Sequence, residues 1–285
     1  MRIPILTAML RILLMLLALS GWFSGAFWLV ADTSITNYPL LLCLIMVLSL
    51  LPILFVLPAS QWWIQLKFCP QKIEHASHER FAFVARIVRH QATLLKLPTP
   101  SLYVYDSDTL NAFIVGGLWR QQHLYLSDAL LTQLSHDDIE AVIAHELAHI
   151  YYQDSVVNEV FFALSLTCML FVEYTLGKAM AWFVNKEDRA EMAKQIAIIM
   201  TYGGLLLPLW LLMLLYSRRS EYRADALASH LVGRQQFIHL LHRLKDICHD
   251  HFFNLDGPQV LLRHYFVSHP PLHHRINAIE ARQQA

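Results

Sequence analysis

The sequence predicts a mainly α-helical integral membrane protein with a small β-sheet. Of its 285 residues, 56% are hydrophobic and only 15% are charged, which is too apolar for an ordinary soluble enzyme. Four long apolar runs account for much of this excess, and short extended segments with turn residues lie between the second and third runs. The net charge is zero, so the composition gives no indication of a nucleic-acid partner.

The first two apolar runs predict two N-terminal transmembrane helices. Residues 12–31 carry no charge over a length that can cross the hydrocarbon core, which takes about 20 residues. Residues 39–58 follow a short polar link and lead to Trp62 and Trp63, an aromatic pair typical of a membrane interface. A cleaved signal peptide is the alternative for the first run, but the run continues beyond the small residues where such a peptide would be cleaved.

The other two apolar runs predict a membrane hairpin. Residues 156–184 are interrupted by Glu173 and Lys178, so this run either crosses the membrane, re-enters it or packs on protein. Residues 195–216 are uncharged, and a membrane helix tolerates their single proline. Lysine and arginine gather before the first run, after the second and after the fourth, which predicts that these places lie on the cytoplasmic side.

The stretch between the second and third runs has the composition of a soluble domain. Hydrophobic periodicity predicts a helix over 73–96, and strands are predicted at 102–105, 111–115 and 123–126. We expect 110–115 to be an edge strand. A second helix is predicted over 137–152, because Ser135 and Asp138 form a capping box ahead of apolar residues at helical spacing. The four cysteines are scattered and indicate neither a disulfide framework nor a cysteine-based zinc site.

The second of these helices carries the motif His145-Glu146-Leu147-Ala148-His149. Residues four apart share a face of a helix, so His145 and His149 can direct two imidazoles at one zinc ion. In zinc hydrolases with this spacing the intervening glutamate is the general base that takes a proton from water whose pKa the metal lowers to about 7. The pattern therefore predicts hydrolytic chemistry, with Glu146 as the catalytic residue.

A catalytic zinc site needs a third protein ligand. An extended motif with a third histidine at position 155 is excluded, because this position holds Ser155. The best candidates are Glu221 and Asp225, which share a face of a later helix. One would bind the metal, and the other could accept the hydrogen bond of a ligand histidine. The alternative is that both are solvated charges that pair with neighbouring arginines.

These motifs resemble the HtpX-type membrane zinc metallopeptidases, a family that also includes the CAAX prenyl endopeptidases. The resemblance rests on residues 145–149 followed by Asp154, on 221–225 after two apolar runs, on 110–113, and on Ser268-His269-Pro270-Pro271 with Arg275. It implies one Zn²⁺ per chain, bound by His145, His149 and Glu221, with Glu146 as the base. It also places His269 near the site, where this residue would donate to the developing oxyanion unless it only shapes a turn.

We therefore expect a zincin-like catalytic domain interrupted by a membrane hairpin. Residues 1–63 would form two transmembrane helices, 64–154 the first part of the catalytic domain, 155–217 the hairpin, and 218–285 the second part with the third zinc ligand. The resemblance implies a multi-pass endopeptidase of the bacterial inner membrane, with its site on the cytoplasmic face. It would hydrolyse peptide bonds in membrane or misfolded proteins, with protein substrates and the lipid bilayer as partners and no nucleic acid. The alternative is a non-catalytic zinc-stabilised membrane scaffold, which would not need Glu146.

Overall fold

The structure of the protein is a computed structural model that describes residues 62, 64–73, 79–116, 121–158, 160–161, 189–252 and 270–281, without the side chains of 79–80, 189–209 and 248–252. The predicted spans 12–31 and 39–58, most of the run 156–184, and His269 lie outside these residues. Among the described residues, no helix has both the length and the apolar character needed to cross a membrane. The membrane crossing of the four runs stays a prediction.

The chain divides into two compact units. One includes Gln61–Val156 and Leu214–Ala285, and the other includes Val157–Met213. The sheet, the HExxH helix and the segment with Glu221 all belong to the first unit. The domain boundaries expected from the sequence stay a prediction.

Within the described residues the sheet has four strands in the order β1-β2-β4-β3. β2 (Ser101–Tyr105) runs parallel to β4 (His123–Ser127), while β1 (Gln71–Lys72) and β3 (Ala112–Val115) run antiparallel to their neighbours. The three strands predicted as short extended segments are confirmed within one residue at each end. β1 was not predicted, because it has only two residues. β3 lies at an edge of the sheet, as predicted.

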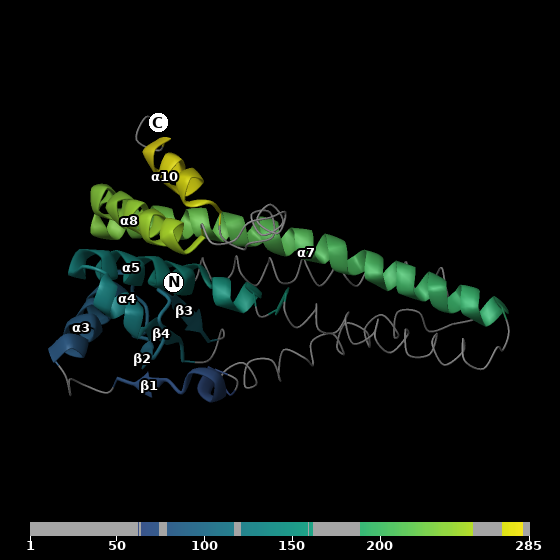
Figure 1. The fold of residues 1–285 in the computed structure, drawn as a ribbon, viewed down its shortest axis with the longest axis horizontal. Coiled ribbons are helices and arrows are strands. Elements are labelled where there is room, and N and C mark those ends of the chain that lie inside the picture. Colours follow the sequence, from purple (N-terminus) through teal and green to yellow (C-terminus); the bar gives the residue numbers. More distant parts are fainter. Residues whose placement is uncertain are drawn as a thin grey trace. The chain divides into compact units, whose positions relative to one another are not determined.

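The helices of this unit surround α5 (His136–Tyr152), which carries the HExxH motif. α5 contacts α3 (Glu79–Leu94) and β3 on one side and α8 (Arg234–Phe252) on the other, and α10 (Leu272–Ala281) packs on α8 (Figure 1). The short α4 (Asp128–Gln133) follows β4 directly. The first unit is thus mostly helical around a small mixed sheet.

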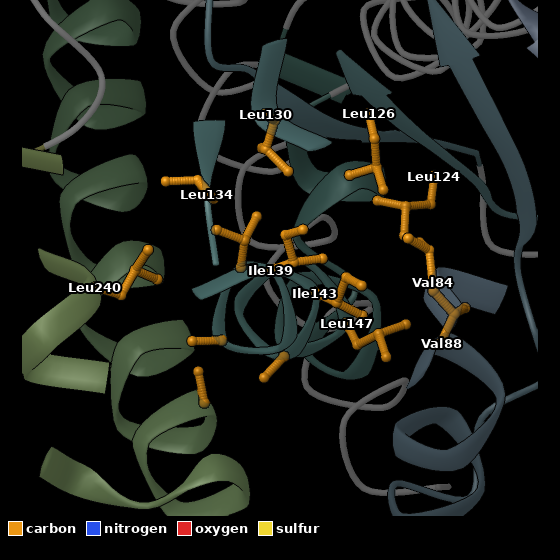
Figure 2. Close-up of a cluster of buried hydrophobic side chains, with 14 of the residues drawn as sticks. Val84, Val88, Leu124, Leu126, Leu130, Leu134, Ile139, Ile143, Leu147 and Leu240 are labelled. Atoms are coloured by element: carbon orange, nitrogen blue, oxygen red, sulfur yellow. The ribbon is translucent and has the colours of Figure 1, made fainter. Parts of the chain in front are cut away.

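The core forms where α5 meets these neighbours. Figure 2 shows Ile139, Ile143 and Leu147 of α5 between side chains of α3 and β4 on one side and Leu240 of α8 on the other. Ile143 and Leu147 are fully buried. Burying an aliphatic side chain of this size contributes about 1.5–3 kcal/mol, so packing fixes the position of α5 on both sides.

Capping fixes where α5 begins. The Ser135 hydroxyl accepts from the Asp138 backbone N–H at 3.2 Å, and Asp138 accepts from the Ser135 backbone N–H at 3.2 Å. This is the predicted capping box, and helix 137–152 is confirmed. At the other end Gln153 adopts the left-handed conformation, with φ of 58°, and its N–H bonds to the His149 and Ile150 carbonyls.

α7 (Arg189–Val232) is one continuous helix of 44 residues. It contains the whole fourth apolar run, 195–216, and continues into the segment with Glu221 and Asp225. This continuity is not predicted from the sequence, where the hairpin, 155–217, and the segment with Glu221 are assigned to separate parts of the chain.

Candidate metal centre

The two histidines of the motif face each other on α5. Their Nε2 atoms lie 3.2 Å apart, and the two rings are nearly perpendicular, with centroids 4.8 Å apart. His145 is buried and His149 is partly buried. The spacing of four residues on a helix produces this arrangement, as the sequence predicts.

Glu221 of α7 completes a group of three potential metal ligands. Its two carboxylate oxygens lie 3.5 Å from Nε2 of His145 and 3.5 Å from Nε2 of His149, one oxygen to each ring. The ligand atoms of the three residues all lie within 4.8 Å of one another. His149 and Glu221 are 72 residues apart in the sequence but are neighbours in the fold.

Each histidine has a carboxylate behind its other nitrogen. Nδ1 of His149 lies 3.0 Å from Oδ2 of Asp154, and Nδ1 of His145 lies 3.0 Å from Oδ1 of Asp225. The first contact is an aligned hydrogen bond, whereas the second is a close charged contact with poorer alignment. Partners of this kind select the ring tautomer and hold the ring in place.

Asp154 connects the end of α5 to α7. Its Oδ1 accepts from the Tyr216 hydroxyl at 2.6 Å and from Nη2 of Arg223 at 2.9 Å. The Arg223 guanidinium also lies over the rings of Tyr152 and Tyr216, 5.1 Å and 5.6 Å from their centroids. Because Asp154 is only 1% exposed, these partners take the place of water around its carboxylate.

Arg275 of α10 holds the second carboxylate. Its guanidinium makes a two-pronged contact with Asp225, in which Nε donates to Oδ2 at 2.7 Å and Nη2 donates to Oδ1. Nη1 lies 3.3 Å from Oε2 of Glu221. A fixed bidentate fork of this kind sets the orientation of both acidic residues.

The carboxylates determine the electrostatics of the centre. Burial alone would lower the pKa of His149, but the hydrogen bond to Asp154 and the charges of Glu221 and Glu146 raise this pKa to about 10. Burial likewise opposes the charged form of His145, and its contacts with Asp225 and Glu221 outweigh burial and raise the pKa. Burial would raise the pKa of Asp225, but the Arg275 guanidinium and His145 lower it. The centre therefore attracts positive charge.

These residues fit a divalent metal ion. With Nδ1 of each ring turned toward a carboxylate, a neutral imidazole keeps its proton on Nδ1 and a lone pair on Nε2. Two such lone pairs and the Glu221 carboxylate then converge, which is unfavourable unless a proton or a cation lies among them. Two imidazole nitrogens and one carboxylate oxygen are a donor set of catalytic zinc sites.

Glu146 faces the same centre without belonging to the group of three. Its side chain is half-buried, and its charge contributes to the raised pKa values of His149 and Arg275. β3 contacts α5, the helix that carries Glu146. A half-buried carboxylate next to this group of potential ligands can meet water.

The sequence predicted His145, His149 and Glu221 as ligands and Glu146 as the base. The structure brings the first three together, with the charge of Glu146 close enough to affect His149, and their roles stay a prediction. The sequence did not assign roles to Asp154, Tyr216, Arg223 and Arg275. Asp154 stands five residues after His149, just past the helix end, which was the one available signal. The contacts of Arg275 could not be found this way, because Asp225 lies 50 residues earlier in the chain.

Comparisons with known proteins agree with this geometry. A family model described as Peptidase family M48 matches residues 78–283. A Protease HtpX from Histophilus somni (strain 2336) is 30% identical over 220 residues, which cover 73% of this chain and 75% of the relative. One from Photorhabdus laumondii subsp. laumondii is 28% identical over 243 residues, covering 79% of this chain and 81% of the relative.

A solved structure shares the fold. The crystal structure of S. mikatae Ste24p matches with a TM-score of 0.56 and 22% identity, and the match covers 97% of this chain and 66% of that chain.

Proposed function

The chain belongs to peptidase family M48, and from this membership and the geometry of the centre we propose that it is a zinc-dependent membrane endopeptidase. The resemblance inferred from the sequence is thereby confirmed at the level of the family. The observation that carries the proposal is the convergence of His145, His149 and Glu221 beside Glu146. His145, His149 and Glu221 would hold one Zn²⁺ per chain.

The residues of the centre have distinct roles in peptide hydrolysis. A bound zinc ion would supply a Lewis acid that lowers the pKa of water and polarises a carbonyl. Glu146 takes a proton from the attacking water and passes it to the leaving amine. Asp154 and Asp225 hold the two histidine rings in place. Arg275 contacts both Asp225 and Glu221 and offsets the repulsion between these two carboxylates. The sequence-based role of His269 as an oxyanion donor stays a proposal.

β3 provides the means of binding an extended peptide. Among the described strands its one neighbour is β4, and we propose that a substrate pairs with its other edge, which we call the open edge. A substrate can add to this edge through backbone hydrogen bonds, and β3 contacts the helix that carries Glu146. This mode requires an unfolded segment, which fits misfolded proteins as substrates.

The membrane location is supported by side chains of α7. Leu211, Leu212 and Leu215 are 47%, 52% and 56% exposed, an unfavourable arrangement in water. Leu215 precedes Glu221 by six residues, which is about 9 Å along a helix. The zinc site would therefore lie close to a membrane surface, where cytoplasmic loops of membrane proteins can reach it.

The sidedness can be tested with a single cysteine. Arg219 is exposed one turn after Leu215, and the lysines and arginines around the apolar runs predict that this position is cytoplasmic. In a chain without its native cysteines, Arg219→Cys should react with an impermeant thiol reagent in inverted vesicles and not in intact cells. Labelling in intact cells would contradict the proposed topology.

The chemistry is tested by replacing Glu146 with glutamine. We expect the purified Glu146→Gln variant to keep about one zinc per chain and to lose about 10²–10⁴-fold in proteolysis of a membrane-protein panel. Glu140→Gln, the same substitution earlier on α5, is the matched control and should keep both properties. Proteolysis by Glu146→Gln at the wild-type rate would overturn the mechanism, and zinc binding without turnover in the wild type would favour the scaffold.

A further inference from the structure

Three stacked aromatic rings cross the sheet on the face that points away from α5. Tyr103 of β2, Tyr125 of β4 and Phe113 of β3 form this aromatic ladder. The ring centroids of Tyr103 and Tyr125 lie 4.9 Å apart at 20°, and those of Tyr125 and Phe113 lie 5.0 Å apart at 13°. The ladder therefore ends on the edge strand, at Phe113.

The two faces of β3 differ in what they offer a paired peptide. Ala112 and Ile114 pack against the core around α5, whereas Phe113 and Val115 pack against the aromatic side. Side chains alternate along a strand. Every second residue of a peptide paired with β3 would thus point toward α5, and the residues between them toward Phe113 and Val115.

The pairing of β3 with β4 decides which backbone groups face the open edge. The Ser127 N–H donates to the Asn111 carbonyl at 2.9 Å, and Phe113 pairs with Tyr125 two residues later. In antiparallel pairing, hydrogen-bonded positions alternate, so Asn111 and Phe113 bond toward β4 and Ala112 and Ile114 direct their N–H and C=O groups outward.

A peptide that adds antiparallel to this edge would bond to Ala112 and Ile114. The residue opposite Phe113 would then occupy a non-hydrogen-bonded pair, in which the Cα atoms come to about 4.5 Å and the side chains are closest. A large ring at that position would extend the stack of Tyr103, Tyr125 and Phe113 by one member.

We propose that Phe113 is a specificity-determining residue that selects an aromatic side chain at one position of the substrate, the residue that pairs with it. This inference rests on the proposed function, because it names the substrate feature that the same site would favour. An aromatic pair contributes 0.5–1.5 kcal/mol beyond its buried area, which is about 2- to 12-fold in kcat/KM. The preference should fall on a single position at a fixed distance from the scissile bond.

The test uses the full-length zinc-loaded protein and a set of peptides that share one cleavable sequence. Each peptide carries phenylalanine or alanine at one position, and the ratio of the two kcat/KM values is measured position by position. We expect one position at which wild type favours phenylalanine. At that position alone, Phe113→Ala should reduce the ratio by about 2- to 12-fold.

Two further variants separate specificity from folding. Phe113→Leu keeps an apolar side chain and should also lose the preference while retaining zinc. Tyr103→Ala removes a ring from the far end of the ladder and should leave the preference in place. If wild type cleaves none of the peptides, both the proposed function and this inference fail. If wild type cleaves them but Phe113→Ala and Phe113→Leu keep its ratio at every position, only this inference is overturned.

Discussion

Replacing Asp154 with asparagine changes one charge at a position that ties two helices together. Oδ2 of Asp154 accepts from His149 at 3.0 Å, while Oδ1 accepts from Tyr216 at 2.6 Å and from Arg223 at 2.9 Å. Asparagine has nearly the same shape and can still accept from His149. It no longer balances the charge of Arg223, and its amide nitrogen has to be placed against a donor.

The magnitude follows from the burial of this group. Asp154 is 1% exposed, so water cannot take the place of its carboxylate as the partner of Arg223. Partners behind metal-binding histidines typically change metal affinity 10–100-fold, which is about 1.4–2.8 kcal/mol. A hydrogen bond to a charged group contributes about 1.5–3 kcal/mol to folding. We expect Asp154→Asn to weaken zinc binding by 10–100-fold and to lower the free energy of unfolding by about 1.5–3 kcal/mol.

Competition against a chromophoric chelator measures the zinc affinity, and denaturant unfolding in the presence of EDTA measures stability without the metal. Asp106→Asn makes the same change at an exposed position after β2 and should match wild type in both assays. A folded Asp154→Asn protein that binds zinc as tightly as Asp106→Asn would refute the reasoning, because His149 would then not need its carboxylate partner.

Two other predictions concern β3 and the protonation of the centre. Ala112→Pro removes an N–H that faces the open edge and should lower kcat/KM while zinc affinity is kept. Phe113→Pro removes a backbone hydrogen bond between β3 and β4 and should lower both kcat/KM and zinc affinity. If Ala112→Pro lowers zinc affinity as much as kcat/KM, this result would count against strand addition. Because the pKa of His149 is raised from 6.5 to about 10 in the metal-free centre, this ring is protonated at pH 7, and zinc must displace the proton. Calorimetry in two buffers of different ionisation enthalpy should therefore show proton release on zinc binding and an affinity that falls as pH is lowered; identical heats in both buffers would contradict the raised pKa.

The sequence predicted those elements whose signals are local. The strands at 102–105, 111–115 and 123–126 are short apolar segments near turn residues, and the helix over 137–152 has both its cap and its period in the sequence. β1 has two residues and exists because β2 offers an edge for pairing, so no local pattern marks it. The continuity of α7 was not predicted, because its apolar and charged stretches differ in composition although both are helical.

The site was predictable to the extent that its residues occur in pairs four apart. His145 with His149 and Glu221 with Asp225 each share a helix face, so the sequence contains half of the geometry. What it does not contain is which carboxylate meets the two Nε2 atoms. The crossing of α5 and α7 decides this, because it brings Glu221 between the rings and leaves Asp225 behind His145.

Arg275 explains why the two acidic residues of α7 can serve different purposes. Two buried carboxylates one helical turn apart repel each other, and each would be driven toward the protonated form. The Arg275 fork contacts Asp225 with two nitrogens and Glu221 with the third, and its charge lowers the pKa of Asp225 beside the histidines. Asp225 lies against the His145 ring, and Glu221 can act as the proposed ligand. Helix α10 therefore contributes one side chain to the candidate metal centre, although none of its residues belongs to the group of three potential ligands.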